Sequence, residues 1–164
     1  MSGRVVHFEI PYDDGERARS FYKEIFDWQL VTMPEVASMS GRVVHFEIPY
    51  DDGDRARSFY TEAFGWQLQS MPGMGYTLAS SGPTGDDGPT ESGFINGGML
   101  PRQQAATPAP VIVIDVDSID ATLERIGGLG GSTVVGKVPV GDMGFAAYFT
   151  DPEGNVVGLW ETAR

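Results

Sequence analysis

One stretch of this 164-residue chain occurs twice, and this repeat limits the possible folds more than any other feature. Residues 1–34 recur at 39–72, shifted by 38 positions and without a gap. The copies differ only at Glu16/Asp54, Lys23/Thr61, Ile25/Ala63, Asp27/Gly65, Val31/Gln69 and Thr32/Ser70. Two nearly identical segments must therefore find packing partners in one chain.

The repeated unit has the pattern of a strand, a helix and a second strand. In copy two, VVHFEI alternates, so Phe46 and Ile48 share one face of a strand while His45 and Glu47 share the other. Pro49 then ends the strand ladder, because proline has no N–H to donate. The pattern predicts a half-buried strand whose polar face carries His45 and Glu47.

A helix is expected to follow this strand. Asp51 or Asp52 can act as its N-cap, and Gly65 as a left-handed C-terminal cap. Apolar residues recur at helical spacing and form one stripe: Ala56, Phe59, Tyr60, Ala63 and Phe64. Burying one such phenylalanine contributes roughly 1.5–3 kcal/mol, so we expect neither copy to stay solvated.

Composition excludes several classes of partner. The net charge of −12 and the isoelectric point near 4.4 argue against nucleic acid and anionic membranes, which bind basic surfaces. The sequence contains no cysteine, no signal-peptide pattern and no apolar run long enough to span a membrane. We therefore expect a cytoplasmic protein that binds neither nucleic acid nor membrane.

The remaining chain predicts further strands at 75–80 and 93–100, separated by a loop. A Pro-bounded linker, 101–110, leads to a second series with the same order. Its strand at 111–116, a helix capped by Asp117 or Ser118, and its strands at 132–140, 145–150 and 155–161 complete a module. The expected fold is α+β, with segments 1–38 (extra βαβ unit), 39–100 (first βαβββ module), 101–110 (linker) and 111–164 (second βαβββ module).

The stretches IPYDDGDRARSFYTEAFGW, at 48–66, and AAYFTDPEGNVVGLWE, at 146–161, open the first module and close the second. With them the chain resembles the vicinal oxygen chelate superfamily over 39–164. That superfamily includes glyoxalase I, extradiol dioxygenases, fosfomycin-modifying enzymes and bleomycin-resistance proteins. The resemblance implies that the two modules curl mixed sheets around a cavity that holds a small molecule.

The resemblance also implies four metal-ligand positions, on the first and last strands of each module. His45 matches the first of them. Asn96 or Gly97, Val111 and Gly158 stand at the other three, where acidic or histidine ligands are usual. Catalytic divalent sites need about three protein ligands, so we expect no metal or other cofactor; a divalent metal bound by His45 and Glu47 is the alternative.

Several residues are candidates for binding or catalysis. His45 and Glu47 could act as an acid–base pair, with the carboxylate raising the pKa of the imidazole, or His45 could be a hydrogen-bonded wall residue. The expected ligand-binding residues are Asn96, Val111, Asp115, Tyr148, Gly158 and Trp160. Among these, Gly158 would leave volume and Trp160 could stack on a flat ligand or simply pack in the core.

Three functions remain open from the sequence. The first is a metal-free protein that binds a small molecule, as resistance proteins of the superfamily do. The second is a lyase, isomerase or dioxygenase that uses His45 and Glu47. In the third, the duplicated segment drives assembly: copy two keeps the native position, and copy one docks at a sheet edge across the interface of a homodimer.

Overall fold

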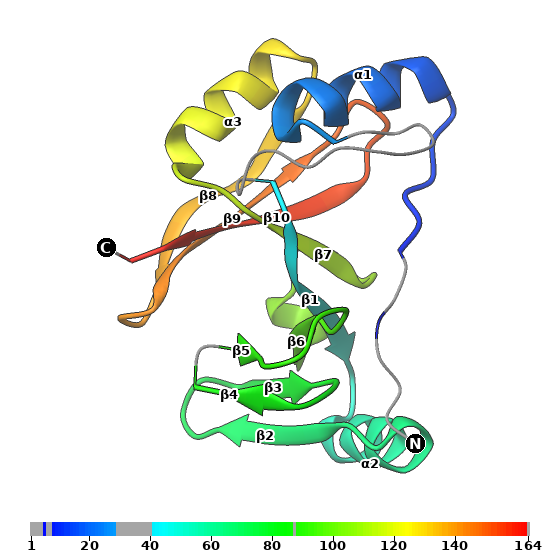
Figure 1. Cartoon of the computed structure of the whole chain (residues 1–164), viewed down its shortest axis with the longest axis vertical. Coiled ribbons are helices and arrows are strands. Elements are labelled where there is room, and N and C mark those ends of the chain that lie inside the picture. The colour runs from blue at the N-terminus through cyan, green and yellow to red at the C-terminus, as the bar shows by residue number, and fades with distance from the viewer. Residues whose placement is uncertain (1–4, 6–7, 29–40, 87, 164) are drawn as a thin grey trace. The chain divides into compact units, whose positions relative to one another are not determined.

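The structure is a computed structural model, which describes residues 5, 8–28, 41–86 and 88–163 (Figure 1). It confirms the expected α+β class, with helices packed on mixed sheets. The chain divides into two compact units: unit 1 comprises Met1–Glu9 and Val44–Ile112, and unit 2 comprises Ile10–Val43 and Val113–Arg164. The four sequence segments proposed above stay a prediction.

Unit 1 contains a mixed sheet with the strand order β2-β3-β6-β1. Strand β1 runs parallel to β6, whereas β3 is antiparallel to both β2 and β6. The elements are β1 (Val43–Tyr50), α2 (Gly53–Phe64), β2 (Gln67–Met71), β3 (Tyr76–Ser80) and β6 (Asn96–Pro101), with a short β4–β5 hairpin (Thr84–Gly85, Gly88–Pro89) and a 3-10 turn, Arg102–Gln104. The alternation read from VVHFEI is confirmed, because Phe46 packs with Trp66 and Ala79 in the core of this unit.

Unit 2 has the strand order β7-β10-β9-β8, with β7 parallel to β10 and the other neighbours antiparallel. Its elements are α1 (Gly15–Phe26), β7 (Val111–Asp115), α3 (Ile119–Gly128), β8 (Ser132–Val140), β9 (Gly144–Thr150) and β10 (Val156–Thr162). Helices α1 and α3 lie over the same face of this sheet (Figure 1). The core beneath them is formed by Ile114, Ala147, Phe149, Val157 and Leu159.

Helix α1, from copy one, is buried along its apolar stripe. Phe21 and Phe26 are only 3% and 4% exposed, and both rings contact Phe149 on β9. We expected copy one to dock at a sheet edge. That expectation is wrong, because β9 is an interior strand and the helix of copy one packs on a face of the sheet. Residues 8–14 contain no strand, and the predicted second strand of copy one lies outside the described residues.

Helix α2, from copy two, is the exposed copy, and the expectation that its stripe would be buried is wrong. Phe59 is 58% exposed and Phe64 40% exposed, although their counterparts in α1 are buried. Tyr60 and Trp66 still stack, with ring centroids 5.0 Å apart, as Tyr22 and Trp28 do in copy one. The difference arises from tertiary packing, because the residues of the two stripes are nearly the same.

Both repeated helices end as their sequences predict, in a left-handed residue. Gly65 has φ 70° and Asp27 has φ 55°, and the N–H of each donates to the carbonyl four residues earlier. Glycine adopts this conformation without a steric penalty, whereas aspartate is somewhat strained in it. Asp52 caps α2 as expected, by accepting a hydrogen bond from the N–H of Arg55.

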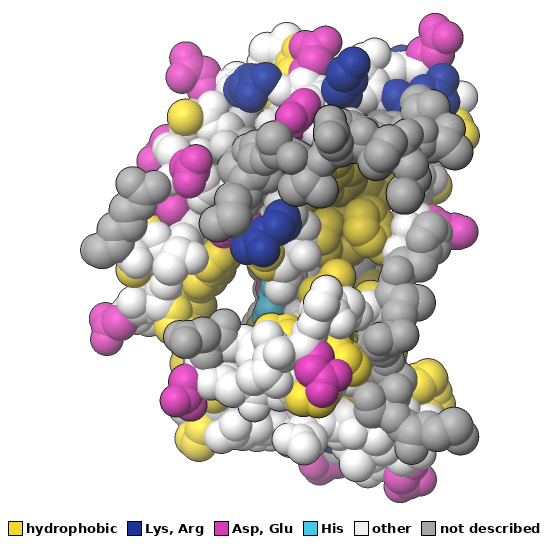
Figure 2. Space-filling model, viewed as in Figure 1, with side chains coloured by type: hydrophobic (Ala, Val, Ile, Leu, Met, Phe, Trp, Pro, Cys, Tyr) yellow, Lys and Arg dark blue, Asp and Glu magenta, His cyan; other side chains and the backbone are white. Residues whose placement is uncertain are grey.

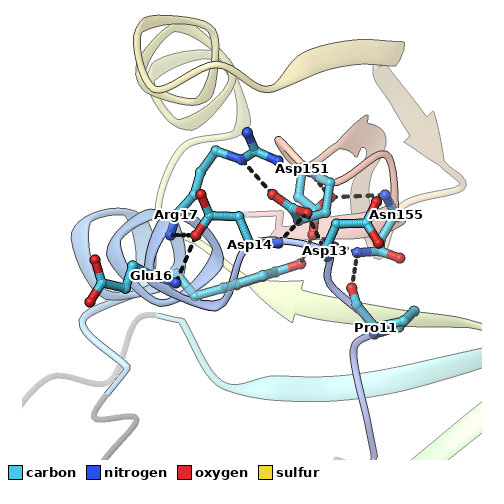
Figure 3. Close-up of polar contacts among 9 residues, drawn as sticks. Pro11, Asp13, Asp14, Glu16, Arg17, Asp151 and Asn155 are labelled. Carbon is cyan, nitrogen blue, oxygen red and sulfur yellow. Dashed lines mark hydrogen bonds and ion pairs between the residues drawn. The ribbon is translucent and has the colours of Figure 1, made fainter.

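The loop between β9 and β10 receives α1 through a set of polar contacts (Figure 3). Asp151 is almost completely buried, and its carboxylate accepts bonds from the backbone N–H groups of Glu153 and Asn155 at 2.9 and 2.8 Å. It also accepts one from the hydroxyl of Tyr22 at 2.8 Å. Burial and the neighbouring Asp151 raise the pKa of Tyr22.

Glu153 completes this contact with the start of α1. Its carboxylate pairs with the guanidinium of Arg17 and accepts backbone N–H bonds from Asp13 and Asp14 at 2.8 and 3.1 Å. The amide of Asn155 donates to the carbonyl of Pro11 at 2.8 Å. We call the surface formed by Phe149, Asp151, Glu153 and Asn155 the α1 seat.

The α1 seat makes the free energy of unfolding depend on pH in the acidic range. The hydrogen bond from Arg17, helped by the N–H of Asp13, lowers the pKa of Glu153 from 4.5 to about 2. The folded state therefore favours the carboxylate, and this stabilisation is present above pH 4.5 and lost as the pH falls towards about 2. Urea unfolding across that interval should show declining stability, and Glu153→Gln should decline less steeply; equal slopes would contradict the assignment.

The outer faces of α1 and α3 carry charges of both signs (Figure 2). They include the exposed side chains of Glu16, Arg19, Lys23, Glu24, Asp120, Glu124 and Arg125. This placement agrees with amphipathic helices that bury one stripe and solvate the other. Among the described residues, no helix is long and apolar enough to cross a membrane.

Candidate functional site

His45 lies on the face of the unit 1 sheet opposite the Phe46 core. It stands beside Asn96 of β6, and Glu47 stands beside Gly98 in the same register. Residues paired in this way project from the same side of a sheet. The prediction that His45 and Glu47 share a face is therefore confirmed, and Asn96 shares it with them.

The partner of the His45 imidazole is a tyrosine from the neighbouring part of the sheet. Its Nε2 lies 2.8 Å from the hydroxyl oxygen of Tyr76, at the start of β3. The Tyr76 ring occupies the space above Gly98, where an added Cβ would lie 1.9 Å from the hydroxyl oxygen. Only glycine at position 98 lets the phenol cross the strand to reach His45.

Burial keeps His45 neutral. Loss of solvent lowers the pKa of His45 from 6.5 to about 4. The expectation that a nearby carboxylate raises this pKa is thus wrong, because desolvation opposes the charged form and dominates here. At neutral pH the imidazole and the Tyr76 phenol form an uncharged pair that can donate and accept hydrogen bonds.

Asn96 holds a loop together with its side-chain amide. The Asn96 Oδ1 accepts from the backbone N–H of Ser81 at 3.2 Å, and its Nδ2 donates to the Thr84 hydroxyl at 2.9 Å. Ser81 in turn donates from its hydroxyl to the carbonyl of Ile95. These contacts give Asn96 a structural task at the base of the β4–β5 hairpin.

Gly158 does not leave the empty volume that its lack of a side chain suggested. It stands opposite Val113 on β7, and an added Cβ would lie 2.9 Å from a methyl group of Val113. The valine fills the space instead. A carboxylate side chain at position 158 would therefore require Val113 to move.

Three of the remaining predicted binding residues, Asp115, Tyr148 and Trp160, share the unit 2 sheet face opposite α1 and α3. Trp160 is paired with Asp115, and Tyr148 with Gly158. The Trp160 indole N–H donates to the Thr162 hydroxyl at 3.0 Å, and burial raises the pKa of Asp115. Val111, two residues before Val113 on β7, is buried. Asp115, Tyr148 and Trp160 are partly buried, so this face combines aromatic surface with one carboxyl group.

The donor set does not fit a divalent metal. Of the four expected ligand positions, the first carries the His45 imidazole. At the second, the Asn96 amide holds a loop through its bonds to Ser81 and Thr84. Val111 and Gly158 offer no donor at all. Across the described residues, His, Cys, Asp and Glu form no group of three that could hold an ion.

Parts of the sequence and the fold are similar to those of known proteins. The family model described as "Bleomycin resistance protein-like N-terminal" matches residues 4–41 and again 42–82. The fold is also that of the methylmalonyl-CoA epimerase of Streptomyces coelicolor, at TM-score 0.53 and 19% identity, over 76% of this chain and 99% of that one. Together these similarities support the vicinal oxygen chelate superfamily, which the sequence motifs resemble.

Further similarities are lower in sequence identity or cover a shorter part of the chain. A Mn(II)-bound glyoxalase of Novosphingobium aromaticivorans has TM-score 0.55 and 14% identity, over 80% of this chain and 42% of that one. A candidate glyoxylase of Mycobacterium tuberculosis is 37% identical over 51 residues, which are 31% of this chain. The chain spans only 20% of the length of that relative.

Two features of this protein were not predicted from the sequence. The alternation of GYTLAS could have placed Tyr76 on the His45 face once β3 and β6 were paired, but no local signal indicates that pairing. The α1 seat was also missed. DPEGN read only as a turn, although Asp151 and Glu153 both bind a helix more than 120 positions earlier in the chain.

Proposed function

We propose that this protein binds a small organic molecule without a divalent metal. The state of His45 carries the proposal: a neutral imidazole, hydrogen-bonded to Tyr76, replaces the ligand cluster expected of metal-using relatives. Such a pair can recognise a carbonyl, hydroxyl or amide group of a ligand. On unit 2, taken by itself, Trp160 and Tyr148 form a separate aromatic surface of the kind on which a flat ligand stacks.

The net charge of −12 indicates the charge of the ligand. An acidic protein repels polyanions over long distances and attracts cations. Coenzyme A esters, named with the epimerase relatives, carry several negative charges and are therefore disfavoured here. The proposed ligand class is neutral or cationic, largely planar and partly apolar.

The low pKa of His45 disfavours the alternative of an acid–base enzyme that uses His45 and Glu47. A histidine with a pKa of about 4 is uncharged at pH 7 and is a weak proton acceptor. Efficient general bases have pKa values near the working pH. We therefore favour a binding function over a lyase, isomerase or dioxygenase activity.

Binding can be tested by calorimetry with two kinds of probe, Mn²⁺ or Zn²⁺ alone and bleomycin as a cationic organic molecule that carries a planar aromatic group. We expect heat from bleomycin only, and a loss of about tenfold or more in affinity for Tyr76→Phe, because a phenol hydroxyl in a ligand contact contributes about 1–2 kcal/mol. Tyr50→Phe, whose hydroxyl makes only a long bond to Gly75, is the matched control. Stoichiometric metal binding that His45→Ala abolishes would overturn the proposal.

A further inference from the structure

The residues with which copy one contacts the α1 seat all recur in copy two. Each has an identical counterpart 38 positions later, and the pairs are Pro11/Pro49, Asp13/Asp51, Asp14/Asp52, Arg17/Arg55, Phe21/Phe59, Tyr22/Tyr60 and Phe26/Phe64. The seat therefore has two chemically equivalent candidates within one chain. In the described residues only α1 occupies it.

The two helices differ at the positions that adjust this fit. Ile25 is buried in α1, and the equivalent Ala63 offers a smaller apolar surface. Both helices end in a left-handed residue, Asp27 in α1 and Gly65 in α2, and this cap is internal to each helix, so it does not decide which copy occupies the seat. The difference between Ile25 and Ala63 favours α1 on the seat.

The chain can also lead either helix to unit 2. Copy one passes from unit 1 to unit 2 between Glu9 and Ile10, five residues before α1 begins. Val5, before this point, packs against the unit 1 core cluster of Phe46 and Trp66. The same residue types precede α2, but there they form β1, which pairs with β6, so copy two can make this connection only when the end of β1 separates from β6.

We propose that α1 and α2 are alternative occupants of the α1 seat, and that α2 of the same chain takes the seat when α1 is displaced. In this proposal Phe59 and Phe64 are exposed because α1 already occupies the seat that they would contact, and not because they bind another protein. Copy one acts as an internal competitor that keeps α2 on unit 1.

The absence of cysteine from the sequence allows a direct test in the full-length chain. Arg17→Cys with Glu153→Cys reports α1 on the seat, because these two side chains form an ion pair there. Arg55→Cys with Glu153→Cys reports α2 on the seat. Both pairs lose the same seat carboxylate, so each controls for the other, and a short thiol-reactive cross-linker traps whichever pair is adjacent.

Cross-linking is compared with and without Phe21→Asp, which places a charge on the buried stripe of α1. Without it we expect the 17–153 product. With it we expect the 55–153 product within single chains to rise at least tenfold, and adding Phe59→Asp to remove it. A chain carrying Phe21→Asp that unfolds cooperatively but yields no 55–153 product overturns the proposal, as does a product found only between two chains.

A milder change keeps the test valid if Phe21→Asp prevents folding. Tyr22→Phe removes only the hydroxyl that donates to Asp151. We expect it to raise the 55–153 product severalfold, and the matched Tyr60→Phe to leave the 17–153 product unchanged. An unchanged 55–153 product in folded Tyr22→Phe overturns the proposal.

Discussion

Phe149→Ala is expected to lower the free energy of unfolding by about 3–5 kcal/mol, because it removes a fully buried ring and leaves a cavity in its place. Phe149 contacts Phe21 and Phe26 of α1, so the substitution creates a cavity beneath the helix as well as within the sheet. The surrounding backbone belongs to an interior strand and can relax only partly.

Urea unfolding followed by circular dichroism measures this loss. Val138→Ala is the control, since Val138 lies in the same sheet but is 41% exposed and should change stability by less than about 1 kcal/mol. A Phe149→Ala protein as stable as the control would show that α1 does not pack on β9.

Gly98→Ala is expected to destabilise the protein by about 1–3 kcal/mol and to separate His45 from Tyr76. The added Cβ would lie 1.9–2.3 Å from three atoms of Tyr76, so the aromatic ring must move. Its displacement admits water to the imidazole. The pKa of His45 should then rise from about 4 towards 6.5, because burial is what lowers it.

The pKa of His45 can be followed by NMR titration of the imidazole. Gly127→Ala is the matched control, since nothing lies within 4 Å of an added Cβ at this position of α3. That control should keep the His45 pKa and slightly stabilise the helix, because alanine is a better helix former. An unshifted His45 pKa in Gly98→Ala would mean that Tyr76 does not shield the imidazole.

The repeat connects these two predictions. Phe149 tests the surface that accepts copy one, and Gly98 tests the unit that contains copy two. If α2 replaces α1 in the manner proposed, the loss from Phe149→Ala should persist with Phe21→Asp, because either helix places equivalent phenylalanines on β9.

Local sequence determined much of this protein. Alternation identified β1 and the shared face of His45 and Glu47, and Asp52 and Gly65 defined the ends of α2. The α+β class and the superfamily followed from the order of the elements and from two motifs. These features depend on interactions between residues close in the chain, or on patterns with a fixed period, which a single sequence displays directly.

Tertiary structure alone decided which copy is buried. Residues 15–26 and 53–64 have nearly the same sequence and form the same helix, yet only the first covers Phe149. Propensity and amphipathicity cannot separate two such segments, because both have the same apolar stripe. Tertiary structure also brought Tyr76 to His45 and filled the space beside Gly158 with Val113, since each contact joins strands that are distant in sequence. Such contacts depend on which surfaces are already occupied, and a sequence pattern carries no information about occupancy.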